Sequence, residues 1–393
     1  MISKFDSSYV GTVDMEKLGY LGTPINDRWY SNEQLAGALH KAVAYAKTMD
    51  GLGYDTFWMA EHHFQPEGTE CIPNLLMMAM HLVNQTKRLR IGCGFNVVPM
   101  WHPLRLAEDY ATADILSGGR VIFGVARGYH TREVETFGAP LIDQDANREM
   151  FEEGVDLIFK SFNEERFSHK GKYYTAPPEV PYRGYTLKEI TLVPRPMRLP
   201  VECWQPIQSG SDRAFDFMAK HGISGLIGGG SAEGGAVDRH MNGFRDAYAR
   251  RGIKLEPGEK LALGYQFHIA ESREAAMKAA ATAYEENMKM FGELRLVRAI
   301  TDQQIAAMRD PSLVPNTKLP RIEDAVKAGG FLAGTPADII EQLKAVEKRY
   351  PGLNRVVCSM PLGTPLAVTL EQLDRFAKEV MPAFKTEVRA AAD

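Results

Sequence analysis

The sequence predicts an α/β protein folded as one (β/α)₈ barrel over residues 1–393, with excursions at about 163–200 and 285–330. Strand-like and helix-like segments alternate along the whole chain, and strict alternation of this kind is typical of a parallel sheet. A doubly wound open sheet would show the same alternation, but no Gly-x-Gly-x-x-Gly fingerprint follows the first strand. Because there is also no linker that marks a domain boundary, the barrel is favoured; such barrels span about 200 to over 400 residues.

The first half of the chain supplies the clearest β/α units. The first helix is expected from Ser31, because Ser31 and Gln34 form a capping box ahead of apolar residues at helical spacing. The strand before it is either 4–13 or 18–21, and the pattern does not choose between them. Further strands are expected at 54–59, 89–98 and 120–126, and further helices at 74–84, 103–116 and 147–162.

The second half resumes the alternation after a segment rich in proline and tyrosine at 163–200, where we expect a surface excursion that can contain a short hairpin. Residues 291–330 have no clean period. Thr335 and Pro336 open one helix as cap and first-turn proline, and Thr369 with Gln372 predicts a capping box for the last helix. The strands are expected at 201–204, 223–227, 261–269 and 355–360, and the other helices at 211–221, 235–251 and 272–290.

Composition excludes several classes of protein. The net charge of −4 and the pI of about 6.2 argue against nucleic acid as the main partner. The four cysteines stand far apart with no Cys-x-x-Cys, so we expect mostly buried, reduced thiols rather than a zinc ribbon or disulfide scaffold. The N-terminal residues carry no signal-peptide core, and no window holds 18 uninterrupted apolar residues. These features predict a soluble, cytoplasmic protein with no membrane partner.

Polar residues follow the expected strands, where barrel enzymes place their active sites. After the second strand come Glu61, His62 and His63. No His-x-His and no His-Glu-x-x-His occurs in the chain, so no metal site is expected. One histidine of the pair is a candidate proton donor or acceptor, and the alternative is that both are hydrogen-bonded structural groups.

A second constellation predicts an anion site. Arg127 and Gly128 follow the strand at 120–126, and Ser209, Gly210 and Ser211 stand at the start of the helix at 211–221. Backbone N–H groups at a helix N-terminus bind phosphate, and an arginine adds a bidentate clamp. The alternative for Ser211 is an ordinary helix cap.

Several motifs in the same order resemble the bacterial luciferase-like, flavin-dependent monooxygenase family, over about residues 30–385. The motifs are FWMAEHHF (57–64), TKRLRIG (86–92), HP (102–103) with AED (107–109), LSGGR (116–120), GVARG (124–128), FG (137–138), SGS (209–211) and GTP (334–336).

The resemblance implies a TIM barrel that binds reduced FMN at the carboxyl ends of its strands and uses O₂, through a C4a-peroxyflavin, to oxygenate a small organic substrate such as an aldehyde or ketone. It also implies a separate NAD(P)H:flavin reductase as the source of reduced FMN, and a homodimer. His62 matches the family's active-site histidine, and we take it, rather than His63, as the residue that faces the flavin; strand alternation would then turn Glu61 and His63 away. The expected flavin contacts are Gly94, Phe95, Asn96, Arg127, Tyr129, Ser209, Gly210 and Ser211, with a cis peptide at Gly94–Phe95.

Two departures and three alternatives accompany the resemblance. The position of luciferase's reactive cysteine is Ala126 here, and the segment 291–330, where the family often carries a mobile loop, has no diagnostic sequence. The alternatives are a deazaflavin-dependent dehydrogenase or reductase of the same superfamily, a metal-dependent barrel hydrolase, and a flavin-binding protein without catalysis.

Overall fold

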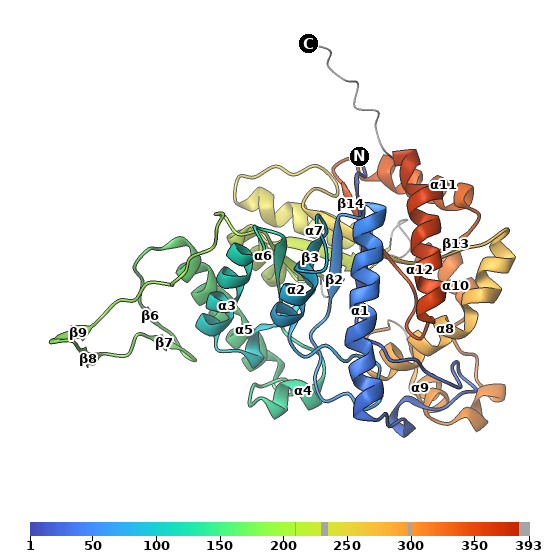
Figure 1. The fold of residues 1–393 in the computed structure, drawn as a ribbon, viewed down its shortest axis with the longest axis horizontal. Helices are drawn as coiled ribbons and strands as arrows, with labels where there is room; N and C mark the ends of the chain where they lie inside the picture. The colour runs from blue at the N-terminus through green and yellow to red at the C-terminus, as the bar shows by residue number, and fades with distance from the viewer. Residues whose placement is uncertain (209, 229–234, 298–299, 385–393) are drawn as a thin grey trace, which may run out of the picture.

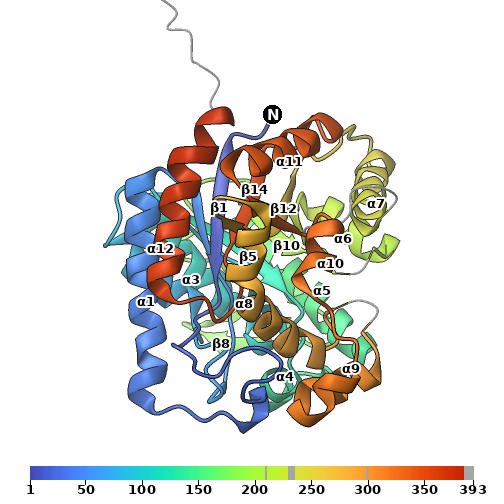
Figure 2. The same cartoon turned by 90° about the vertical axis from the view of Figure 1, so that its right-hand side faces the viewer.

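Eight parallel strands close into a barrel in the computed structural model, which describes residues 1–208, 210–228, 235–297 and 300–384 (Figures 1 and 2). Each strand pairs with the next around the ring, and pairing of β5 with β10 completes the circle. The predicted fold class is therefore confirmed. The barrel strands are β1 (Lys4–Tyr9), β2 (Thr56–Met59), β3 (Arg90–Cys93), β5 (Val121–Ala126), β10 (Cys203–Pro206), β11 (Ser224–Gly228), β12 (Leu261–Ile269) and β14 (Arg355–Ser359).

The first strand is the earlier of the two alternatives. Lys4–Asp6 of β1 lie opposite Arg355–Val357 of β14, and Ser7–Tyr9 lie opposite Phe57–Met59 of β2. Residues 18–21, the other alternative, form part of a turn. Strand β1 thus joins the last strand of the barrel to the second, which no local pattern in the sequence could indicate.

Helices surround the barrel (Figure 2). Ser31 caps α1 with the expected capping box, and Thr335 caps α11 together with Asp338. Ser211, Gly235 and Ser272 stand at the N-caps where the sequence placed them. The longer helices are α1 (Asn32–Leu52), α2 (Leu75–Val83), α3 (Pro103–Leu116), α5 (Gln144–Asn163), α6 (Asp212–His221), α7 (Ala236–Arg250), α8 (Arg273–Glu293), α11 (Pro336–Arg349) and α12 (Leu366–Arg375), and the shorter ones are α4 (Thr131–Thr136), α9 (Asp302–Arg309) and α10 (Ile322–Lys327).

Two expectations about the last third of the chain are wrong. An additional strand, β13 (Phe331–Gly334), pairs with the carboxyl half of β12, although the sequence indicated no strand there. The capping box of the last helix does not form, because α12 begins at Leu366 and buries Thr369 within it. Gln372 instead accepts from the backbone N–H of Ile269 (2.7 Å) and donates to its carbonyl (3.1 Å), which satisfies the end of β12.

The predicted strand at 89–98 forms two strands, β3 and β4 (Asn96–Val97), and the peptide between Gly94 and Phe95 is cis, as the resemblance implied. Strand β4 follows this peptide and pairs with the carboxyl end of β5. The excursion at 163–200 contains two short hairpins, β6 (His169–Lys170) with β7 (Thr175–Ala176) and β8 (Val180–Tyr182) with β9 (Tyr185–Leu187), and the second extends far from the barrel (Figure 1).

A buried polar network lies at the amino end of the barrel strands, far from the strand ends that carry the site. Arg355 of β14 donates to Asp6 of β1 and to Asp55 (2.6 Å), and Trp58 donates to Asp6 (2.7 Å). Burial raises the pKa of Asp6 to about 6, although Arg355 opposes this shift. The charges of Arg355 and its carboxylate partners compensate one another here. This network therefore contributes to the stability of the barrel and not to the chemistry of the active site. None of the described helices is both long and apolar enough to span a bilayer.

Candidate active site

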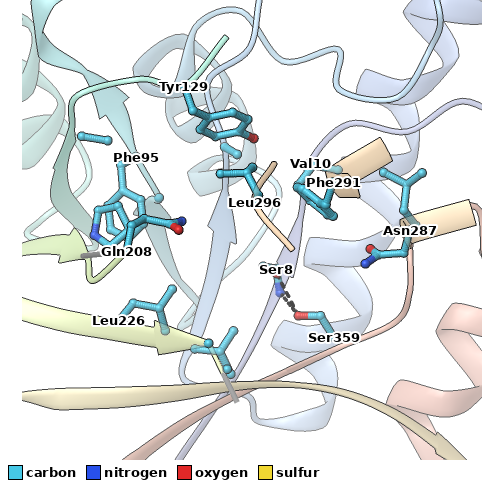
Figure 3. A pocket seen from close by; sticks show the side chains of 18 of the residues that line it. Ser8, Val10, Phe95, Tyr129, Gln208, Leu226, Asn287, Phe291, Leu296 and Ser359 are labelled. Atoms are coloured by element: carbon cyan, nitrogen blue, oxygen red, sulfur yellow. Dashed lines mark hydrogen bonds between the residues drawn. The ribbon is translucent and has the colours of Figure 1, made fainter. Parts of the chain in front are cut away.

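A large cavity opens at the carboxyl ends of the barrel strands. Its volume is about 1210 Å³, which exceeds the roughly 300–1,000 Å³ of a pocket for one drug-sized ligand. Phe95, Gln208 and Leu226 lie on one side of it, and Val10, Asn287 and Phe291 lie on the other (Figure 3). A cavity of this size accommodates a cofactor and a second molecule together.

His62 lines the cavity and is held between two carboxylates. Its Nδ1 lies 3.2 Å from a carboxylate oxygen of Glu133, at the start of α4, and its Nε2 lies 3.0 Å from Oε1 of Glu70. All three side chains are at least nine-tenths buried. Both ring nitrogens therefore face acceptors, which is the arrangement of an imidazolium that donates from both sides.

The charge on His62 follows from these contacts. Burial by itself would lower the pKa of His62, but Glu70, Glu133 and Glu61 outweigh it, and the pKa is raised above its ordinary value. The pKa of Glu133 is lowered because burial, which would raise it, is outweighed by the hydrogen bond from His62. The two partner carboxylates stand apart from His62 in the sequence, so the sequence alone did not indicate this shift in the pKa of His62.

Glu70 joins His62 to two further groups. Its Oε1 accepts from the Tyr129 hydroxyl (2.9 Å), and its Oε2 lies 2.9 Å from Nε2 of His130. The Tyr129 hydroxyl also lies 3.0 Å from Nε2 of His62. Ligand atoms of His62, Glu70 and His130 lie within 4.8 Å of one another, close enough to hold a metal ion. Hydrogen bonds already satisfy each of these atoms, so the cluster does not require a metal to neutralise it.

The neighbours of His62 differ from the expectation in one respect. As expected, His63 does not line the cavity, and its Nε2 lies 3.2 Å from Glu61. Contrary to the expectation, Glu61 lines the cavity. Its carboxylate accepts from the backbone N–H of Val97 (2.6 Å) and from the indole N–H of Trp101 (2.8 Å). Strand alternation fails for Glu61 because β2 ends at Met59, before these residues.

Two buried polar groups near β5 have oxygen atoms without hydrogen-bond partners. Asn96 donates to the carbonyl of Gly124 (2.9 Å), which leaves its Oδ1 unpartnered, and Gln205 on β10 has an unpartnered Oε1. Gln205 lines the cavity together with Gly94 and Phe95, whereas Asn96, another expected flavin contact, is not among the described residues that line it. An unsatisfied buried amide costs free energy, so a ligand with hydrogen-bond donors on an apolar ring, such as a flavin, suits this part of the cavity.

Only some of the residues predicted for an anion site line the cavity. Arg127 lines the cavity, with Nε donating to Asn147 (2.8 Å) and Nη2 to the carbonyl of Gln144 (2.9 Å). Burial and the nearby Arg148, which also lines the cavity, lower the pKa of Arg127. Two arginines that share one end of the cavity are suited to an anion such as the phosphate of FMN.

Two of the residues predicted at the start of α6 do not line the cavity. Ser211 caps α6 by accepting from Ala214 N at 3.4 Å, and neither Ser211 nor Gly210 is among the described residues that line the cavity. Ser209 lies outside the described residues. The contact of these residues with a phosphate stays a prediction.

The sequence missed the residues that complete the site. Arg148, Glu70 and Glu133 carry no motif of their own, and their charges alone do not separate them from the other charged residues of the chain. The signal that existed was position: Glu133 closely follows a strand end, and Glu70 lies in the same loop as His62.

The chain belongs to the luciferase-like monooxygenase family, whose model matches residues 17–351. It is 25% identical over 365 residues to the oxygenase component of a flavin-dependent trigonelline monooxygenase from Acinetobacter baylyi, covering 90% of this chain and 92% of that one. Its match to the alkanal monooxygenase alpha chain of Aliivibrio fischeri is 32% identical but spans only 126 residues, which are 32% of this chain and 34% of that one.

Solved structures share the fold at lower identity. The oxygenating constituent of 3,6-diketocamphane monooxygenase from Pseudomonas putida, in complex with FMN, has a TM-score of 0.69 at 18% identity and covers 97% of this chain and 99% of that one. An F420-dependent secondary alcohol dehydrogenase has a TM-score of 0.66 at 14% identity, covering 98% of this chain and 100% of that one. Family membership identifies a relative of flavin-dependent oxidoreductases, and the cofactor and reaction follow only as a proposal.

Proposed function

We propose that this protein is the oxygenase component of a two-component monooxygenase, which uses reduced FMN and O₂ to oxygenate a small organic substrate. A separate NAD(P)H:flavin reductase would supply the reduced FMN, since the Acinetobacter relative is the oxygenase component of its monooxygenase. A homodimer is part of the proposal by analogy with the family.

The observation that carries the proposal is a buried histidine held between two carboxylates in the wall of a cavity large enough for two molecules. His62 has carboxylates on both ring nitrogens, and the cavity of about 1210 Å³ has two arginines at one end. Insertion of one oxygen atom releases the other as water, which requires protons in a site closed to bulk solvent. A proton held at Nε2 of His62 meets that need.

The chain's own residues have separate roles in this proposal. Arg127 and Arg148 would bind the phosphate of FMN, and the side chains of Phe95 and Gln205 would contact its ring system. Bound reduced flavin would supply two electrons to O₂, so that one oxygen atom enters the substrate and the other leaves as water. His62 would hold a proton at Nε2, and Tyr129, whose hydroxyl lies 3.0 Å away and donates to Glu70, would fix the orientation of the ring.

The test is an anaerobic titration with reduced FMN followed by admission of O₂. Saturable binding of reduced FMN, with slower release of hydrogen peroxide than from free reduced FMN, is the expected result, because an oxygenase shields the reacting flavin from bulk water. Release as fast as from free flavin, despite binding, would refute the oxygenase function.

A second candidate is a deazaflavin-dependent dehydrogenase, favoured by the shared fold with the F420-dependent alcohol dehydrogenase. It transfers hydride and needs no O₂. The same titration with a reduced deazaflavin in place of reduced FMN separates the two candidates: tighter binding of the deazaflavin and no O₂-dependent reaction would support the dehydrogenase.

A further inference from the structure

One stripe of α8 forms the cavity wall opposite Phe95 and Gln208. Tyr284, Asn287, Met288 and Phe291 all line the cavity, at the three- and four-residue spacing of a single helix face. Figure 3 shows Phe291 and Asn287 beside Val10, across the cavity from the side that carries Gln208. This end of the cavity is therefore mainly apolar, with Asn287 as the amide group on the stripe.

The opposite face of α8 fixes the rotation of the helix. Glu286 pairs with Arg28 (2.6 Å) and with Lys289 (2.9 Å), and Lys289 also donates to the carbonyl of Thr23 (2.8 Å). The side chains of this ion cluster are almost completely buried. Breaking one partner out of a buried ion cluster is strongly destabilising, so the helix cannot easily turn Asn287 away from the cavity.

Asn287 is buried without a hydrogen-bond partner among the described residues. Its side chain is 7% exposed, it lines the cavity, and its carboxamide points toward the cavity interior in Figure 3. The carboxamide is not among the buried side-chain atoms that lack a partner, so it is open to water in the cavity, and a ligand that displaces this water must replace its hydrogen bonds. A ligand atom at this end of the cavity would therefore complete the hydrogen bonds of the Asn287 carboxamide.

The charges of the cavity show which ligand fits. Lys41 lines it but is paired with Asp14 (2.6 Å), and the other described cations in the lining, apart from His62, are Arg127 and Arg148 at the anion end. The α8 stripe itself offers no cation for a carboxylate. A charged ligand group buried here would lose its hydration without gaining an oppositely charged partner, which costs much free energy. A neutral group avoids this cost.

We propose that Asn287 determines specificity by binding the single polar group, a carbonyl or a hydroxyl, of a neutral and otherwise apolar substrate. Asn287 can serve either group, because its amide both donates and accepts. The inference rests on the proposed function, since it takes the α8 end of the cavity as the place of the oxygenated substrate.

The test compares two probes of similar skeleton, cyclohexyl methyl ketone and cyclohexanecarboxylate. Binding is measured by calorimetry with the FMN-saturated protein and with the flavin-free protein, without reductant. The ketone should bind at least 10-fold more tightly than the carboxylate. Asn287→Leu should weaken binding of the ketone by about 3- to 10-fold, the effect of one net hydrogen bond, whereas the matched variant Met288→Leu on the same stripe should change it by less than about 2-fold.

Three results would overturn the inference: tighter binding of the carboxylate, no binding of the ketone, or equal ketone binding by the wild type and Asn287→Leu. The comparison of the two probes on the wild type needs no variant, so it stands even if Asn287→Leu folds poorly. Because neither reductant nor O₂ is present, these results are independent of the reduced-FMN titration, in which failure of the proposed oxygenase function would be seen.

Discussion

Replacing Glu133 by glutamine removes one of the two carboxylates that hold the ring of His62. Three donors converge on this carboxylate: His62 Nδ1 at 3.2 Å, the backbone N–H of His63 at 3.0 Å and the amide of Gln65 at 2.8 Å. Glutamine has nearly the same shape, but its amide nitrogen must face a donor. The variant therefore tests the charge of the group without opening a cavity.

The size of the effect follows from one charge-assisted hydrogen bond. Such a bond contributes ~1.5–3 kcal/mol, and one pKa unit corresponds to about 1.36 kcal/mol. The pKa of His62 should therefore fall by about 1–2 units in Glu133→Gln. Because the pKa of His62 is raised in the folded protein, the stability it contributes is fully present below its unfolded value and is lost as pH rises through the folded value. The variant should move that loss, and the alkaline limb of any His62-dependent activity, to lower pH.

The measurement is an NMR titration of the histidine ring protons in selectively labelled protein, with the His62 signal assigned by its absence in His62→Ala. Glu67→Gln is the matched control, because Glu67 lies in the same loop as His62 but pairs with Arg132 at 2.8 Å. This control variant should leave the pKa of His62 unchanged. An unchanged or higher pKa of His62 in Glu133→Gln would show that the carboxylate does not hold the imidazolium.

Three further variants test the rest of the molecule. His62→Ala should reduce product formed per flavin oxidised by ~10²–10⁴ while reduced FMN still binds, and His63→Ala should not; a destabilised but fully coupled His62→Ala enzyme would contradict the catalytic role. Arg127→Ala should weaken binding of reduced FMN by ~1.5–3 kcal/mol, and an unchanged dissociation constant would exclude Arg127 from the anion site. Arg355→Met leaves Asp6 without its charge partner in the barrel interior and should lower the free energy of unfolding by ~3–5 kcal/mol. Denaturant titration measures this change, and a loss below about 1 kcal/mol would contradict the stabilising role of the ion network.

The sequence by itself determined the features that depend on residues close together in the chain. The capping box of Ser31 and Gln34 forms because both partners lie in the same helical turn. Alternation of strand and helix patterns predicted a parallel α/β fold, and the missing Gly-x-Gly-x-x-Gly fingerprint and domain linker favoured the barrel. His62 and Arg127 were found because each follows a recognisable strand. In all these cases the residues that define the feature lie close together in the chain, so tertiary contacts were not needed to predict it.

The tertiary structure alone decided what comes together from afar. It selected residues 4–9 as the first strand through pairing with β14, and it added β13 beside β12. It also placed Glu133, 71 positions along the chain, against His62, and it turned Asn287 of α8 into the cavity. Pairing and convergence of this kind depend on the contacts of the closed barrel, and a single carboxylate or amide leaves no periodic pattern in the sequence from which its partner can be deduced.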